Sequence, residues 1–199
     1  MTALWGLTGG IACGKSTVSR LLEQQGATII DADVLAREVV APGSDGLRDI
    51  VSTFGPGVLA PDGTLDRKVL GAAVFGDEGK RRALNAITHP RIAALAAQRT
   101  QEALARGDRV VIYDAPLLME NNLHHGMEQV LVVAASEETQ LRRLKERDGL
   151  DEAAARARMA SQMPLDQKRQ HATHVFENDG TLEQLEAQVH RFWQAHAPR

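Results

Sequence analysis

A run of nine residues near the N-terminus has the composition and spacing of a phosphate-binding loop. It fits the pattern G-x-x-x-x-G-K-[ST], and its residues are Gly9, Gly10, Ile11, Ala12, Cys13, Gly14, Lys15, Ser16 and Thr17. The glycines let successive backbone N–H groups point toward phosphate oxygens. Lys15 adds a mobile cation for the terminal phosphates, and Ser16 offers a hydroxyl to Mg²⁺, a cation that prefers oxygen ligands. We therefore expect residues 10–17 to bind nucleotide phosphates and Ser16 to bind the metal.

The sequence on either side of this loop has the order that such a loop needs. Residues 3–7 are a short apolar run, which is typical of a buried parallel strand. After the loop, Val18, Leu21 and Leu22 recur at helical spacing. A helix that begins at the loop directs the positive end of its dipole toward the bound phosphate. The pattern predicts strand, phosphate loop and helix in succession.

Two carboxylates, Asp31 and Asp33, follow a second predicted strand over residues 27–30. In open α/β sheets ligands bind beyond the carboxyl ends of the strands, so we expect these side chains near the phosphate loop. They share a face if the chain stays extended, because alternate residues then point the same way, but not if a helix begins at Asp33. One of them could instead cap the helix expected over residues 34–40. We expect a catalytic or metal-binding role for at least one of the two.

A third apolar run over residues 109–114 ends in Asp114 and resembles a Walker B strand. The carboxylate of such a strand serves Mg²⁺ directly or through water. An aspartate at a strand end can equally well cap the segment that follows, and the sequence leaves both roles open. Similar runs over residues 129–134 and 174–177 predict two further strands.

The stretch from residue 41 to residue 108 has a mostly helical pattern and is far too long for a simple crossover between parallel strands. It is typical of a helical insertion that forms a substrate-binding lobe. We expect a break at His89-Pro90, because Pro90 lacks a backbone donor and disfavours helical dihedrals at His89. On a later helix, Arg143 and Arg147 are four residues apart and share a face. That face is either an ordinary charged surface or a cationic lid over the phosphates.

Composition narrows the class of protein. The 199 residues carry a net charge of −3, which gives no sign of a nucleic-acid or membrane-surface protein. The single cysteine excludes an internal disulfide and a multi-cysteine metal site. We see no signal-peptide pattern and no apolar run long enough to span a membrane, so we expect a cytoplasmic protein.

Taken together, the motifs resemble those of bacterial dephospho-CoA kinases along nearly the whole chain. The resemblance implies an α/β P-loop NTPase fold with a three-layer core and a parallel five-stranded sheet, all within a single domain over residues 1–199. The core would comprise residues 1–33, 108–136 and 172–199, the helical CoA-binding insertion about 34–107, and the lid about 137–171. The motifs that carry the resemblance are Thr8 to Ile11 before the lysine of the loop, Ile30 to Asp33, Ile87 to Pro90, Asp114 to Glu120, Gln140 with Arg143 and Arg147, and Gln162, Lys168, Ala172 and Val175 to Asn178.

The resemblance also implies an activity and a set of roles. The enzyme would use ATP and Mg²⁺ to phosphorylate the ribose 3′-hydroxyl of dephospho-CoA, the last step of coenzyme A synthesis. Asp33 matches the general base of that family, while Lys15, Arg143 and Arg147 would act on the phosphates. Asn178 falls in the segment that approaches the adenine. His89 and Asp114, together with Asp33, would contact the substrate.

Two other classes share parts of this pattern. A shikimate-like kinase also pairs a P-loop with D-x-D, but the long insertion and His89-Pro90 argue against it. A GTPase-type switch would need an Asn-Lys-x-Asp motif, which the sequence lacks. Cys13 departs from the dephospho-CoA kinase pattern, where a small residue such as serine is usual. It is either an activated thiol beside Lys15 or, as we expect, a small apolar filler of the core.

Overall fold

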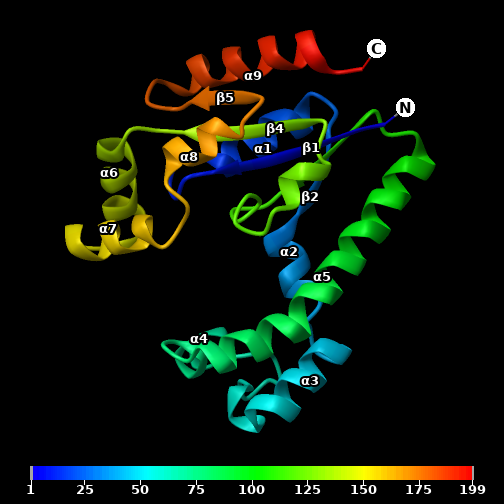
Figure 1. Cartoon of the computed structure of the whole chain (residues 1–199), viewed down its shortest axis with the longest axis vertical. Coiled ribbons are helices and arrows are strands. Elements are labelled where there is room, and N and C mark those ends of the chain that lie inside the picture. The colour runs from blue at the N-terminus through cyan, green and yellow to red at the C-terminus, as the bar shows by residue number, and fades with distance from the viewer. Residues whose placement is uncertain (1, 199) are drawn as a thin grey trace. The chain divides into compact units, whose positions relative to one another are not determined.

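A parallel sheet of five strands belongs to the first of two compact units into which the chain divides. In the computed structural model, which describes residues 2–198, this first unit contains the chain up to Ile30 and again from Ala103 onward. The sheet has the order β2-β3-β1-β4-β5 (Figure 1), and the predicted α/β fold with a five-stranded parallel sheet is confirmed. The strands are β1 (Ala3–Gly9), β2 (Thr28–Asp31), β3 (Val110–Asp114), β4 (Gln129–Ala134) and β5 (His174–Glu177).

The three central strands are apolar and buried along almost their whole length. Strands of a parallel sheet have this character because helices cover both faces of the sheet. On β1, the Trp5 ring packs edge-on against Phe192 and Trp193, with ring centroids 5.4 and 5.8 Å apart. These contacts anchor the C-terminal helix to the strand that leads into the phosphate loop.

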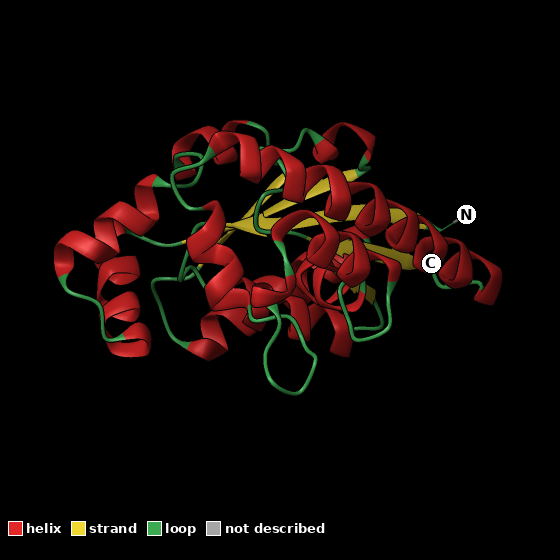
Figure 2. Cartoon of the chain, turned by 90° about the horizontal axis from the view of Figure 1, so that it is seen from below, coloured by secondary structure: helices red, strands yellow, loops and turns green. Residues whose placement is uncertain are grey.

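Some helices of the first unit pack against strands of the sheet, and Figure 2 shows helices (red) beside the strands (yellow). Contacts join α1 to β1, α8 to β4 and α9 to β5, and α1 also packs against α9. The helices that lie entirely in this unit are α1 (Lys15–Gln24), α6 (Glu137–Asp148), α7 (Glu152–Ala160), α8 (Leu165–Gln170) and α9 (Leu182–His196), with a short 3₁₀ turn η2 (Leu123–Gly126).

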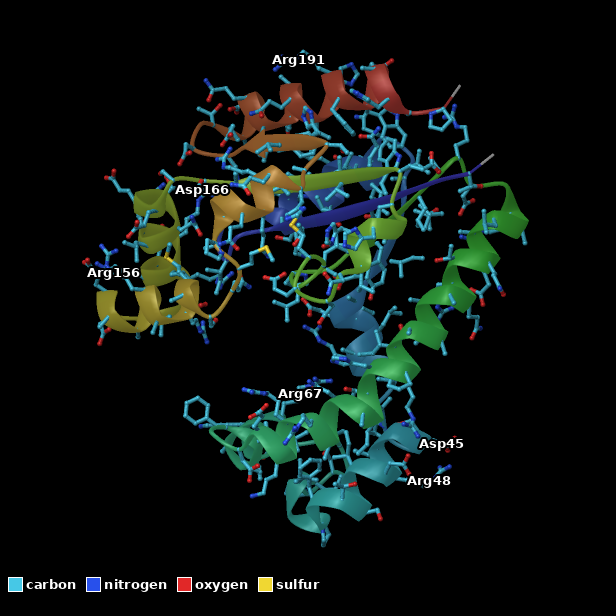
Figure 3. The ribbon with its side chains drawn as sticks, viewed as in Figure 1. Asp45, Arg48, Arg67, Arg156, Asp166 and Arg191 are labelled. Carbon is cyan, nitrogen blue, oxygen red and sulfur yellow. The ribbon has the colours of Figure 1, made fainter. Side chains whose placement is uncertain are left out.

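The second unit, Asp31–Glu102, is helical and has its own hydrophobic core. It contains α2 (Ala32–Glu38), α3 (Asp45–Phe54), the 3₁₀ turn η1 (Pro56–Val58), α4 (Arg67–Val74) and most of α5 (Glu78–Arg106). A side-chain oxygen caps the start of three of these helices: that of Asp31 caps α2, that of Ser44 caps α3 and that of Asp66 caps α4. Asp45 and Arg48 form an exposed ion pair in the first turn of α3 (Figure 3).

The break predicted at His89-Pro90 is wrong, because α5 continues through Pro90 without interruption. A proline inside a helix removes one hydrogen bond, and that loss can be offset by packing. Here apolar residues on both sides of Pro90 pack against the same core cluster, and they keep helical spacing across it. These residues are Leu84, Ile87, Ile92 and Leu95.

None of the helices in the described part of the chain is both long enough and apolar enough to cross a membrane.

Candidate active site

The phosphate loop follows β1 and leads directly into α1, in the predicted order. Its backbone turns sharply at Gly14, where φ is +91°, and at Ala12, where φ is +59°. Gly14 is the N-cap residue of α1, and no side chain among the described residues caps that helix. The first N–H groups of an uncapped helix are the natural donors to a phosphate.

The side chain of Asn178 is hydrogen-bonded to the backbone of this turn. Its Nδ2 donates to the carbonyl oxygen of Cys13 over 2.8 Å. A Cβ on Gly14 would lie only 2.2 Å from the same Nδ2, so no larger residue fits at position 14 without displacing Asn178. The resemblance assigned Asn178 to the adenine segment, whereas its side-chain amide here supports the backbone of the phosphate loop.

Lys15 and Asp114 come together although 99 residues separate them in the chain. The Nζ of Lys15 donates to Oδ1 of Asp114, and the two form an ion pair. The Asp114 side chain is 2% exposed and that of Lys15 is 18% exposed, so Lys15 is the member of the pair that solvent reaches. Of the two roles left open for Asp114, the pairing favours the Walker B-like one; a role at the metal stays a prediction.

Of the two predicted lid arginines, Arg143 contacts the phosphate loop. Its guanidinium donates to the carbonyl oxygens of Ala12 over 3.3 Å and Asn178 over 2.9 Å. Arg147 instead donates through Nε and Nη2 to Asp148, the next residue, and its side chain is 60% exposed. The two arginines share a helical spacing but have different partners. The role of Arg147 at the phosphates stays a prediction.

Asp31 and Asp33 have different local roles. The Asp31 carboxylate accepts from the N–H groups of Asp33 and Val34 over 2.7 and 3.2 Å and caps α2. Because α2 begins at Ala32, the two carboxylates do not share a face of an extended segment. Asp33 is exposed in the first turn of α2, and its role as general base stays a prediction. His89 is exposed on α5 in the second unit.

Comparison with known proteins decides the family. The profile of the dephospho-CoA kinase family matches residues 3–184. The chain belongs to the dephospho-CoA kinase family. A dephospho-CoA kinase of Geobacter metallireducens is 52% identical over 188 residues, which cover 94% of each sequence. A solved structure from Thermus thermophilus has a TM-score of 0.82 at 33% identity, covering 99% of both chains. The dephospho-CoA kinase of Campylobacter jejuni has a TM-score of 0.68 at 27% identity, covering 98% of both chains.

Membership of the dephospho-CoA kinase family decides against the two alternative classes, the shikimate-like kinase and the GTPase-type switch. It also gives a context to residues that sequence reasoning left without a role. Two of them, Glu120 and Lys168, appear in the motifs that carry the resemblance. Only its place in that motif could have indicated a special role for Lys168, because a lysine is otherwise expected at the protein surface.

Lys168 is a fully buried lysine that joins two segments of the dephospho-CoA kinase core. Its Nζ donates to the Pro116 carbonyl over 2.8 Å and pairs with Oε1 of Glu120 at 3.0 Å. The same carboxylate oxygen accepts the Met163 N–H over 3.0 Å. Burial raises the pKa of Glu120, but hydrogen bonds from Lys168 and from backbone amides outweigh it and leave that pKa lowered. The pair thus ties the loop after β3 to the segment that enters α8.

Replacing the fully buried Lys168 by methionine should lower the free energy of unfolding by about 3 kcal/mol, because the half-buried Glu120 carboxylate then loses its cation. Urea unfolding followed by circular dichroism measures the loss. Lys145→Met is the matched control, since Lys145 also pairs with a glutamate, Glu152, at 3.1 Å, but on the surface. An exposed pair contributes less than about 1 kcal/mol. Equal losses of unfolding free energy in the two variants would show that the pair of Lys168 with Glu120 contributes no more than a surface ion pair.

Cys13 turns into the core, as we expected of a small apolar filler. Its side chain is 0% exposed, and burial raises the pKa of the thiol to about 11. A Cβ on Gly10 would lie 2.8 Å from its Sγ, so the sulfur fills the space beneath the loop. The nearby cation of Arg143 acts in the opposite direction on the pKa but does not outweigh the desolvation.

We expect iodoacetamide at pH 7 to leave the folded protein unmodified, because a thiol with a pKa of about 11 is only on the order of one part in ten thousand thiolate at that pH. Mass spectrometry after a fixed exposure measures the labelling. Denatured protein is the control and should be labelled fully at the one cysteine of the chain. Rapid labelling of the folded protein that MgATP suppresses would instead identify an activated thiol.

Proposed function

We propose that the protein transfers the γ-phosphoryl group of ATP to the ribose 3′-hydroxyl of dephospho-CoA, giving coenzyme A and ADP. This is the last step of coenzyme A biosynthesis. The observation that carries the proposal is the family match over residues 3–184, which includes both the phosphate loop and the helical unit.

The donor side of the reaction rests on the phosphate loop. The N–H groups at the uncapped start of α1 donate to phosphate oxygens, and Lys15 neutralises the terminal phosphates. Arg143 already lies against the loop, where its guanidinium can stabilise charge that develops on the transferred group. The contribution of these groups is electrostatic, because the protein supplies little covalent chemistry to a phosphoryl transfer.

The residues at the loop fit a magnesium ion. Ser16 presents an exposed hydroxyl in the first turn of α1, and Asp114 brings a carboxylate to the Lys15 side chain. Hydroxyl and carboxylate oxygens are ligands that Mg²⁺ prefers, so Ser16 would bind the metal and Asp114 would act directly or through water. When bound, Mg²⁺ supplies positive charge to the phosphate oxygens during transfer.

On the acceptor side we assign the general base to Asp33. A carboxylate beside the 3′-hydroxyl orients it and accepts its proton as the oxygen attacks. Asp33 is available for this role because the capping of α2 falls to Asp31, whose carboxylate accepts the two backbone N–H groups. In the same proposal, His89 contacts the substrate and Arg147 contacts the phosphates.

The lid that the sequence predicts spans about residues 137–171, and we assign its moving part to α6 and α7, because α8 packs against β4 and its buried Lys168 is bonded to the loop after β3. Within it, α6 and α7 contact each other (Figure 1), and exposed ion pairs join them. Arg156 on α7 (Figure 3) pairs with Glu137 at the start of α6 and with Glu152. Such a pair of helices can move as one body over the phosphates and return, which substrate entry and product release require.

A coupled ADP-release assay tests the proposal with three acceptor conditions: dephospho-CoA, shikimate and none. We expect turnover with dephospho-CoA alone, and chromatography of the product should show coenzyme A. ADP release that is equal with and without an acceptor would identify an ATPase, and turnover of shikimate would identify a different kinase.

A further inference from the structure

The turn that follows β5 connects the phosphate loop with the helix that carries Arg143. Its first residue, Asn178, is buried and makes three hydrogen bonds. The N–H donates to the Ala134 carbonyl at the end of β4 over 2.8 Å, and Nδ2 donates to Cys13 in the loop. The carbonyl of Asn178 accepts from Nη2 of Arg143 over 2.9 Å. One residue therefore contacts the sheet, the loop and the arginine.

Asp179, the next residue, holds the start of the helix itself. Its carboxylate accepts the N–H of Ser136 over 2.9 and 3.0 Å and the hydroxyl of Ser136 over 2.7 Å. Ser136 is the N-cap of α6 and also accepts the N–H of Thr139. The side chains of Thr139 and Ser136 lower the pKa of Asp179, so the group is a carboxylate at neutral pH. A negative charge at this end of a helix is also favoured by the helix dipole.

We propose that Asp179 is a positioning residue that sets Arg143 against the phosphate loop by fixing the point about which α6 turns. The inference rests on the role proposed above for Arg143. Asp179 makes no contact with the reacting groups in this proposal; it acts on Arg143 through the start of α6 and through the attraction between its carboxylate and the Arg143 guanidinium.

The lever arm of α6 gives the reason for this assignment. Arg143 lies seven residues beyond Ser136, which is about 10 Å along a helix at 1.5 Å per residue. A tilt of about 10° at Ser136 therefore displaces Arg143 by about 2 Å. Displacements of that size in a group that stabilises the transition state are costly in rate. Two carboxylate oxygens on the N–H and hydroxyl of one residue restrict such tilting more than a single hydrogen bond does.

A double-mutant cycle tests the proposal by comparing Asp179→Ala, Arg143→Ala and the variant with both changes, in steady-state kinetics with ATP and dephospho-CoA. We expect Asp179→Ala to lower kcat about tenfold, with a smaller change in KM for ATP, because the misplaced group acts in the transition state. In the Arg143→Ala background, the same change should lower kcat by less than about twofold, because the group it positions is gone.

Thr181→Ala is the matched control. Thr181 caps α9 two residues further along the same turn, through a side chain that accepts the Gln184 N–H. Its loss removes a helix cap without touching α6, so kcat should stay within about twofold of the unmodified protein. Thermal unfolding of every variant separates a loss of fold from a loss of positioning. If Asp179→Ala does not fold, Asp179→Asn completes the same cycle, since an amide keeps one acceptor and loses the charge.

Three outcomes would overturn the proposal. If the rate losses of Asp179→Ala and Arg143→Ala multiply in the double variant, Asp179 does not act through Arg143. If Asp179→Ala behaves like Thr181→Ala, the carboxylate is only a helix cap. If Arg143→Ala alone leaves kcat unchanged, the role proposed for Arg143 fails too, and that result is distinct from the first two.

Discussion

Replacing Asp33 by asparagine should lower kcat for phosphorylation of dephospho-CoA by about 10²–10⁴-fold, the usual contribution of a positioned general base. Asparagine keeps the shape of the side chain but cannot accept the proton of the 3′-hydroxyl at neutral pH. The dissociation constant of ATP should change little, because Asp33 is not part of the phosphate loop. Steady-state kinetics together with calorimetric titration of a non-hydrolysable ATP analogue measures both quantities.

Asp31→Asn is the matched control for this experiment. Asp31 caps α2 through hydrogen bonds to two backbone N–H groups. Asparagine is as good an N-cap as aspartate, so this variant should keep both its stability and most of its turnover. A collapse of kcat in Asp31→Asn with little effect in Asp33→Asn would transfer the base role to Asp31.

Lys15→Ala should reduce phosphoryl transfer by about 10³-fold or more, because a preorganised cation at the terminal phosphates is lost. The variant should still fold, although it should lose some stability because the Asp114 carboxylate, which is only 2% exposed, loses its ion pair with Lys15. Lys15 is the more exposed member of its pair with Asp114 and is not one of the residues that make up the hydrophobic core. Single-turnover kinetics measures the rate, and circular dichroism confirms the fold. Near-normal turnover of the folded variant would place the phosphate site elsewhere.

Lys15→Arg separates charge from position in the same experiment. It keeps the cation, but the larger planar guanidinium does not reproduce the compact contact of an ammonium with the Asp114 carboxylate. We expect activity between those of Lys15→Ala and the unmodified protein. Recovery of full activity would mean that only the net charge at this position matters.

Local sequence was enough to predict the elements that build the donor site. The strand, loop and helix around Gly14 and Lys15 follow from apolar runs and glycine spacing, which act over a few neighbouring residues. All five strands appear close to their expected positions, because buried parallel strands are short, apolar and bounded by turns. The cap on α2 was also among the expectations, since the hydrogen bonds of an N-cap span only two or three residues.

The tertiary structure decided which of the charged residues meet. Lys15 and Asp114 are paired by the adjacency of β1 and β3, and Lys168 is buried by the loop after β3. Arg143 contacts the phosphate loop while Arg147 pairs with its neighbour, although both follow the same helical spacing. Spacing places residues on a face of a helix, but the partners on that face come from distant segments.

The same reasoning explains where sequence rules failed. Pro90 removes a hydrogen bond, which predicts a break, yet the core of the second unit packs on α5 on both sides of it. Asp179 gave no signal of its own, because its partner Ser136 lies 43 residues away. Sequence by itself determined the phosphate loop, the strands and the family resemblance, since these depend on local pattern. Packing between distant segments determined the charge pairs, the buried lysine and the anchor of α6, since each needs two parts of the chain to meet.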